Sequence, residues 1–200
     1  MPGYIRKVLT PLLPLLLYSL FASAQSSVTA IPFDSLTDGE QHIFKIINEY
    51  RKSKKLPEII YSPSLSFVAR THAKDQTKHH KFKNRCNLHS WSDEGSWSSC
   101  CYTSDHKRAE CMWNKPRELT SYSGDGFEIS FYSTFKYASE AAFAADALAG
   151  WKKSPGHNSI IINLGQWKNT QWKAMGVGIH GNYINVWFGK IGDIDQKPDQ

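Results

Sequence analysis

All four cysteines of this 200-residue chain fall within 26 residues, at Cys86, Cys100, Cys101 and Cys111. In an exported protein such a cluster indicates disulfides, and four cysteines allow three pairings. The neighbours Cys100 and Cys101 are poorly placed to bond each other, which favours a bond from each to Cys86 or Cys111. A structural zinc site is the alternative, although the spacing lacks paired C-x-x-C knuckles. We therefore expect a loop stapled by disulfides.

The N-terminus predicts export. Two basic residues precede an apolar stretch over residues 8–21, and the small residues 22–24 form a cleavage site, so residues 1–24 are expected to be a signal peptide. The mature chain would begin near Gln25. The apolar stretch of about 14 residues is shorter than the roughly 20 that span a bilayer, and no later segment is apolar enough. We expect a secreted protein, extracellular or periplasmic, without a membrane span.

Size and charge favour one domain and give no reason to expect a nucleic-acid partner. Without residues 1–24 the chain has 176 residues, and its net charge falls from +6 to +4 because that segment holds two basic residues and no acidic ones. Such a length favours a single domain, here expected to be a monomer. The remaining charge is scattered except over residues 78–85. This basic run is interpreted as a solvated loop, with a groove for an anionic partner as the alternative.

The first half of the chain predicts two helices. A capping box at Thr37 and Glu40, followed by apolar residues at helical spacing, indicates a helix over residues 38–54. Ser62 and Pro63 then start a second helix, with an N-cap followed by proline at the first helical position. Its apolar stripe consists of Leu65, Val68, Ala69, His72 and Ala73. His72 is therefore expected to be a hydrogen-bonded core histidine, and a ligand role is the alternative.

The second half predicts a loop, a strand, a helix and a hairpin. Residues 84–125 are polar, have no sustained period and are interpreted as a long loop over a site. A strand over 127–135, a helix over 139–152 capped by Ser139, and strands over 174–180 and 183–190 joined by Gly181-Asn182 follow. Together these elements predict an α+β fold, a three-layer α/β/α sandwich with a mostly antiparallel central sheet and a disulfide-stapled loop insertion.

Three separate segments supply candidate site residues. The helix over 139–152 ends in a Ser-Pro-Gly turn that presents His157, the loop supplies His89, and Glu128 enters an apolar strand. Two imidazoles and one carboxylate are a common ligand set for zinc and leave a coordination position open. Each residue also has a structural alternative. His157 could cap a following segment over residues 159–163, His89 could be a polar loop residue, and Glu128 could pair with a lysine or arginine.

The assembled pattern resembles the CAP superfamily, which comprises cysteine-rich secretory proteins, antigen five and plant pathogenesis-related group-one proteins, and in particular its short bacterial-type variant. The resemblance covers about residues 38–191, nearly the whole mature chain. Single elements are weak, but their order and spacing together are specific. The motifs are Asn48-Glu49-Tyr50-Arg51, Leu65 to Asp75, Cys86-Asn87-Leu88-His89-Ser90, Gly126-Phe127-Glu128-Ile129, Trp151 with Ser154-Pro155-Gly156-His157, Gly176-Val177-Gly178 and Trp187-Phe188-Gly189.

The resemblance implies a CAP domain over residues 37–191, an N-terminal extension over 25–36 and a tail over 192–200. It also implies an α/β/α sandwich with a central cleft that holds two histidines and two glutamates. His89, Glu128 and His157 match three members of that tetrad.

Two departures from the family's pattern bear on the cleft. The second glutamate normally stands three residues after a tryptophan such as Trp151, where this chain has Ser154, and a hydroxyl is a poor metal ligand at neutral pH. The segment between His89 and Glu128 is much longer than usual, so we expect the disulfide loop to roof the cleft.

The tryptophans at 151, 167, 172 and 187 are expected to be core residues.

Three functional hypotheses follow. The first is a secreted, non-catalytic domain that binds zinc or another divalent cation through His89 and His157, with Glu128 as a third ligand or as a hydrogen-bond orienter. Its partner would be an unidentified protein, peptide or lipid at the cleft. The second is a secreted metal-dependent hydrolase of the peptidase type, with Glu128 as general base. The third is an interaction module whose recognition surface is the loop from Cys86 to Cys111.

Overall fold

The fold described here is that of a computed structural model, which covers residues 31–79 and 85–194. The expected signal peptide over 1–24 and the first half of the extension over 25–36 lie outside these residues, as do residues 80–84 of the basic run and the end of the tail. A short 3-10 helix, η1 (Phe33–Ser35), precedes the domain. None of the helices in the described ranges is both long and apolar enough to cross a membrane.

The centre of the molecule is an antiparallel sheet of three strands, β1 (Gly126–Tyr132), β2 (Ala174–His180) and β3 (Tyr183–Gly189), in the order β1-β3-β2. β2 and β3 form the predicted hairpin, with His180 opposite Tyr183 and Gly181 at a φ of 56°. A left-handed φ favours glycine, which explains the turn sequence. Beyond β2, Tyr61 adds one parallel bridge to Met175, so the prediction of a mostly antiparallel sheet is confirmed.

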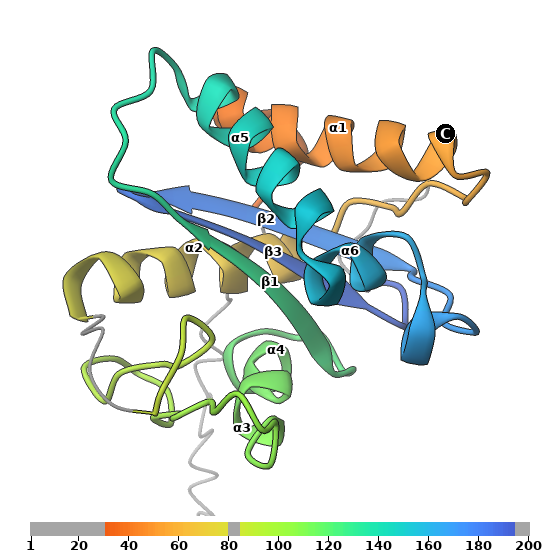
Figure 1. The fold of residues 1–200 in the computed structure, drawn as a ribbon. Coiled ribbons are helices and arrows are strands. Elements are labelled where there is room, and N and C mark those ends of the chain that lie inside the picture. The colour runs from red at the N-terminus through yellow and green to blue at the C-terminus, as the bar shows by residue number, and fades with distance from the viewer. Residues whose placement is uncertain (1–30, 80–84, 195–200) are drawn as a thin grey trace, which may run out of the picture.

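Helices cover both faces of the sheet, which confirms the predicted α/β/α sandwich (Figure 1). On one face lie α1 (Asp38–Ser53), α5 (Glu140–Lys153) and α6 (Pro155–Ile161), with the 3-10 helix η2 (Gly165–Trp167) after them. On the other face lies α2 (Pro63–His79), with the short helices α3 (Glu110–Trp113) and α4 (Lys115–Leu119) below it. Both ends of α1 and of α5, and the start of α2, lie within two residues of the sequence-based expectation, because caps and prolines mark them locally.

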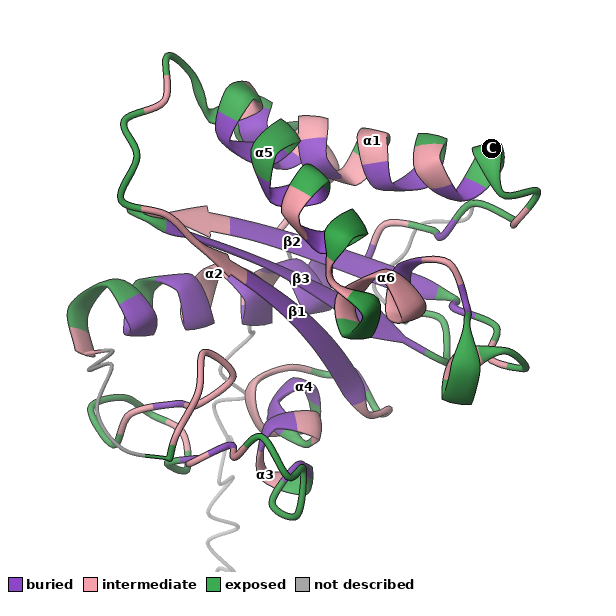
Figure 2. Cartoon of the chain, viewed as in Figure 1, coloured by how far each residue is buried: buried purple, intermediate pink, exposed green. Residues whose placement is uncertain are grey.

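Each face of the sheet has its own apolar core, and the helices turn their buried sides toward it (Figure 2). The first core joins α1, α5 and α6 to the sheet and includes Ile43, Ile47, Phe143, Trp151, Val177 and Val186. The second joins α2 to the disulfide-stapled segment and includes Leu65, Val68, Trp91, Tyr102, Met112 and Trp187. Trp151, Trp172 and Trp187 are buried as expected, whereas Trp167 is only partly buried.

Two glycines of β2 let α2 approach the sheet at backbone distance. A β-carbon on Gly176 would collide with the main chain of Leu65 and Ser66 in α2, and one on Gly178 would collide with the main chain of Ala69 and Arg70. Because main-chain atoms cannot move aside as a flexible side chain can, a larger residue at either position would push α2 off the sheet. His72, on the buried side of α2, is therefore held against the sheet.

The segment between α2 and β1 is not the continuous loop that its composition indicates. It contains α3 and α4, each no longer than five residues, which is too short to show a helical period in the sequence. Pro116 in the first turn of α4 is the only local start signal. Disulfides Cys86–Cys101 and Cys100–Cys111 close the segment, so the expectation that adjacent cysteines pair outward is confirmed.

Candidate functional site

Glu128 in β1 is the centre of a buried ionic network. Its side chain is inaccessible to solvent, and it accepts two short hydrogen bonds, from Nδ1 of His72 at 2.6 Å and from Nδ1 of His89 at 2.8 Å. These three side chains come from a strand, a helix and the disulfide-stapled segment. The carboxylate therefore ties together three parts of the chain that lie far apart in the sequence. The structural alternative for Glu128, an ion pair with a lysine or arginine, is wrong, because its partners are imidazoles.

His72 is a buried, hydrogen-bonded histidine, as expected from its position on α2. Its Nε2 lies 3.0 Å from the carbonyl oxygen of Ser90, so both ring nitrogens face groups that can only accept. The doubly protonated imidazolium is the form that satisfies both contacts. The ring also stacks on Trp91, with 4.3 Å between centroids and 5° between planes. His72 thus links the Glu128 carboxylate of β1 to the main chain of the insertion.

The two imidazoles keep Glu128 ionised. Burial alone raises the pKa of a carboxyl group, but the charges and hydrogen bonds of His72 and His89 outweigh it, so the pKa of Glu128 lies below its ordinary value. An ionised carboxylate with both oxygens occupied is a poor proton acceptor. It is well suited to fix the orientation and the tautomer of His89.

His89 presents one free ring nitrogen to the cleft. Because Nδ1 of His89 binds Oε2 of Glu128, Nε2 is the ring nitrogen that this contact leaves free. The main-chain N–H of His89 donates to Asn87 Oδ1 at 3.0 Å, and its ring meets the edge of Tyr102 with 5.2 Å between centroids. The side chain is 17% exposed, in contrast to the inaccessible His72. His89 is therefore the member of this network that a bound ligand or ion can reach.

His157 reaches the cleft from the first turn of α6. The Ser-Pro-Gly turn is the start of this helix, with Ser154 at the N-cap and proline in the first turn, so the capping role for a segment over 159–163 is wrong. Two residues of α1 hold α6 in place. Tyr50 Oη donates to Asn158 Oδ1 at 3.0 Å, and the buried Arg51 donates to the Ile161 carbonyl at 2.6 Å.

Burial keeps His157 neutral. Loss of hydration lowers its pKa from 6.5 to about 4, and the nearby His89 adds to this effect, while Glu128 opposes it. Within residues 31–79 and 85–194, no group forms a hydrogen bond with the His157 imidazole. A neutral imidazole without a partner is available as a ligand or as a hydrogen-bonding group.

This depressed pKa predicts a pH-dependent stability. Because the folded pKa of His157 lies below the unfolded value, its contribution is complete above pH 6.5 and is lost as the pH falls toward 4. The loss over this window amounts to about 3 kcal/mol of unfolding free energy. Urea denaturation of metal-free wild type and His157→Gln at several pH values checks this, with His42→Gln as the control. The prediction is wrong if the His157→Gln curve has the same slope as wild type between pH 6.5 and 4.

His89, Glu128 and His157 all line one cavity of about 620 Å³. The insertion roofs this cleft, as expected, with Tyr102, His106 and Trp113. The Tyr102 hydroxyl lies 2.8 Å from Nδ1 of His106. The opposite wall consists of residues from α6, η2 and the strand ends, namely Ser154, Gly156, Ser159, Ile160, Gln166, Trp167, Thr170 and Lys190, and Asp125 and Phe127 complete the lining.

His106 is a cleft residue that the sequence did not reveal. It sits in an irregular turn at a φ of 57°, between exposed charged residues and outside any periodic pattern. The only signal was indirect, since the long insertion was expected to cover the cleft. Only the tertiary structure identifies a histidine at such a position as a cleft residue.

The predicted three-ligand metal site is not preassembled. His89 and Glu128 contact each other directly, which leaves neither Glu128 oxygen free, and His157 lies across the same cavity. In the part of the chain that the structure describes, no three His, Cys, Asp or Glu side chains are placed to ligate one ion. The two imidazoles are the groups that fit a cation as ligands. Glu128 would contact the His89 ring and not the cation itself.

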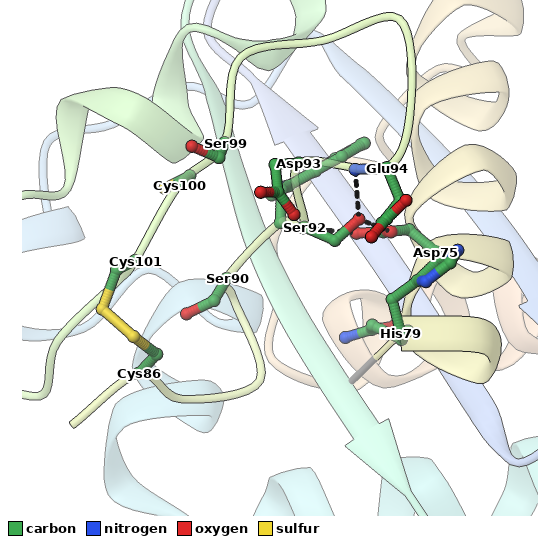
Figure 3. A pocket seen from close by; sticks show the side chains of 12 residues that line it. Asp75, His79, Cys86, Ser90, Ser92, Asp93, Glu94, Ser99, Cys100 and Cys101 are labelled. Atoms are coloured by element: carbon green, nitrogen blue, oxygen red, sulfur yellow. Dashed lines mark hydrogen bonds between the residues drawn. A yellow bond between two sulfur atoms is a disulfide. The ribbon is translucent and has the colours of Figure 1, made fainter. Parts of the chain in front are cut away.

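A second, smaller cavity of about 330 Å³ lies between α2 and the insertion (Figure 3). Asp75 faces it together with His79, Asp93, Glu94 and the disulfide Cys86–Cys101. Both oxygens of Asp75 are occupied, because the main-chain N–H and the hydroxyl of Ser92 donate to them. This carboxylate anchors the insertion to α2 and thereby helps to place His89.

Comparisons with known proteins bear on the family and the fold of this chain. The model of the cysteine-rich secretory protein family (CAP) matches residues 44–187. An extracellular protein containing an SCP domain from Bacillus anthracis has a TM-score of 0.53 and 20% identity, over 76% of this chain and 40% of that protein. An outer surface protein of Borrelia burgdorferi has a TM-score of 0.52 and 15% identity, over 77% of this chain and 93% of that protein.

A cysteine-rich secretory protein from Staphylococcus aureus has a TM-score of 0.49 and 14% identity, over 80% of this chain and 41% of that protein. The chain thus spans only about two fifths of the Bacillus and Staphylococcus proteins. A search among curated proteins finds none that matches.

Proposed function

Because this chain belongs to the cysteine-rich secretory protein (CAP) family, we propose that it is a secreted binding module whose cleft holds a divalent cation and a ligand without catalysing a reaction. The observation that carries this proposal is the convergence of His89 and His157 on one cavity, with Glu128 fixed behind His89. Both histidines offer a neutral ring nitrogen that no side chain of the described ranges occupies.

A cation in this cleft, zinc or another divalent ion, would be held by His89 and His157. Imidazole nitrogens suit zinc. A metal-bound histidine frequently donates its other ring N–H to a carboxylate, which is the position that Glu128 has relative to His89. The remaining coordination positions would belong to water or to the ligand. Such an ion would serve as a Lewis acid or as an anchor for an anionic group of the ligand.

The geometry favours binding over hydrolysis. A general base must be free to take a proton from the attacking water, whereas both oxygens of Glu128 accept hydrogen bonds from His72 and His89. Ser154 stands where the resemblance places a second glutamate, so the cleft lacks another carboxylate at that position. These two features support a binding site and weaken the case for a hydrolase.

Secretion is part of the proposal. Two disulfides persist in oxidising environments, which agrees with the signal peptide expected over residues 1–24. The Bacillus and Borrelia proteins are described as an extracellular protein and an outer surface protein, which supports the same location.

Calorimetric zinc titration tests the cleft. We expect wild type to bind one zinc ion and the double variant His89→Ala/His157→Ala to lose this binding. Glu128→Gln should weaken it about 10–100-fold, because the orienting carboxylate is lost. His42→Ala, on α1 and outside the cleft, is the matched control and should bind as wild type does. Equal zinc affinity in wild type and in the double histidine variant would refute the metal site.

A further inference from the structure

The two edges of the sheet differ in how their outward main-chain groups are satisfied. At the β2 edge, every second residue donates its N–H to a group outside the sheet. These bonds run from Met175 to the Ile60 carbonyl at 2.8 Å, from Val177 to Ser66 Oγ at 3.0 Å and from Ile179 to Glu40 Oε1 at 3.0 Å. The β2 edge is therefore closed to a further strand.

The β1 edge is closed at one end only. Trp151 Nε1 donates to the Ser130 carbonyl at 3.2 Å, so the main-chain groups of Ser130 point away from β3. Because main-chain direction alternates along a strand, those of Gly126 and Glu128 point the same way. Just after β1, the main-chain N–H of Ser133 donates to the Asn182 carbonyl at the β3 side. Odd-numbered residues thus point toward β3 and even-numbered residues point away from it, in agreement with this alternation. The outward groups of Gly126 and Glu128 thus lie beyond the cover that Trp151 provides.

These outward groups have no partner within the described ranges. No hydrogen bond joins the main-chain N–H or C=O of Gly126 or of Glu128 to any residue outside the β1–β3 pairing, although both residues are buried. Buried main-chain groups are nearly always paired with protein or with water. The exception lies beside the cleft, because Glu128 lines it and Gly126 stands between two further lining residues, Asp125 and Phe127.

We propose that the cleft binds an extended peptide, which adds a short strand to the open end of β1. Its main chain would pair with the outward groups of Gly126 and Glu128, which are two residues, or about 7 Å, apart along the strand. This inference rests on the proposed binding function of the cleft but requires no metal. A lipid chain, in contrast, has no donors and acceptors at strand spacing and would leave these groups unpaired.

The walls of the cleft suit the side chains of such a peptide. Alternate side chains of an added strand point to opposite sides. One side meets the aromatic wall of Phe127 and Trp167, whose ring centroids lie 5.0 Å apart, and the ammonium group of Lys190 lies 4.7 Å from the Phe127 ring. An apolar residue and an acidic residue two positions further along the peptide would therefore both face this wall.

Nuclear magnetic resonance of the metal-free, full-length mature protein tests the proposal. The probes are capped hexapeptides in which threonine alternates with phenylalanine, leucine or glutamate, with palmitate as the lipid probe. We expect at least one peptide to shift the amide resonances of Gly126 and Glu128 and to slow the hydrogen exchange of these two amides. The hydrogen exchange of the Ile129 amide should stay unchanged, because Ile129 is paired to β3. The proposal fails if no peptide binds, if binding leaves the two amides unchanged, or if only palmitate binds.

Two matched pairs separate main-chain pairing from simple contact. N-methylation of the peptide residues whose N–H groups point toward β1 should weaken binding about tenfold. N-methylation of the residues between them, whose N–H groups point away from β1, should not. On the protein side, Gly156→Phe should abolish binding, because a β-carbon at Gly156 meets no atom within 4 Å and the new ring can enter the cleft. Ala145→Phe, on the exposed side of α5, should bind normally.

Equal affinity of both N-methylated peptides, or unimpaired binding by Gly156→Phe, would overturn the proposal. The zinc titration is independent of these measurements. If zinc binds and no peptide does, the peptide inference alone fails. If peptides pair with β1 and zinc does not bind, the metal part of the proposed function alone fails.

Discussion

Replacing Glu128 with alanine is expected to lower the free energy of unfolding by about 3–5 kcal/mol at neutral pH. The substitution leaves the inaccessible His72 with one ring nitrogen unpaired in the interior, beside Trp91. It also releases His89, so the insertion loses a contact to the sheet. Urea denaturation followed by tryptophan fluorescence measures the loss.

Glu49→Ala is the matched control, because Glu49 is exposed on α1, and it should change stability by less than about 0.5 kcal/mol. The effect of Glu128→Ala should also depend on pH. Since the folded pKa of Glu128 lies below its unfolded value, the contribution of the carboxylate is present above the unfolded pKa and is lost as the pH falls through the folded one. Wild type and variant should therefore converge in acid. A loss of less than about 1 kcal/mol at neutral pH would contradict this account.

Removing the two disulfides is expected to destabilise the protein by about 6 kcal/mol in total and to loosen the insertion first. The bridges close segments with sequence separations of 15 and 11 residues, and loops of this size are each worth about 3 kcal/mol. The three strands and the helices α1, α2, α5 and α6 contain no cysteine, so these elements should persist after reduction. Far-ultraviolet circular dichroism should change little, while near-ultraviolet signals from Trp91 and Trp97 in the insertion should fade.

The two bridges are separable by paired serine substitutions. Cys86→Ser/Cys101→Ser should affect the cleft more than Cys100→Ser/Cys111→Ser, because Cys86 lies three residues before His89. Zinc affinity should fall in the first pair and be nearly retained in the second. If reduced and oxidised protein denature at the same urea concentration, the bridges do not stabilise the fold.

Much of the sandwich was predictable because its signals are local. The capping box at Thr37, the proline at the start of α2 and the Gly181-Asn182 turn each depend on a few adjacent residues. The helices α3 and α4 were missed because four or five residues cannot display a 3.6-residue period. The start of α6 was taken for a turn because its Ser-Pro-Gly sequence is compatible with both, and only packing against α1 favours the helix.

The members of the cleft were predictable, but their pairing was not. His89, Glu128 and His157 were expected to lie in one cleft, and all three line the same cavity. The sequence offered no sign that His72 would occupy one oxygen of Glu128, because residues 72 and 128 meet only through the packing of α2 on the sheet. That contact supports the proposed role of the carboxylate as an orienting group.

The simultaneous contact of Glu128 with His72 and His89 also constrains how this cleft can diverge in evolution. A change at position 128 leaves two imidazoles without an acceptor, and a change at 72 exposes a carboxylate oxygen to an apolar surrounding. Positions 72, 89 and 128 should therefore change together or not at all among relatives of this chain. Position 157, which no side chain of the described ranges holds, is free to vary alone, so selectivity for different ligands can evolve there without loss of the fold.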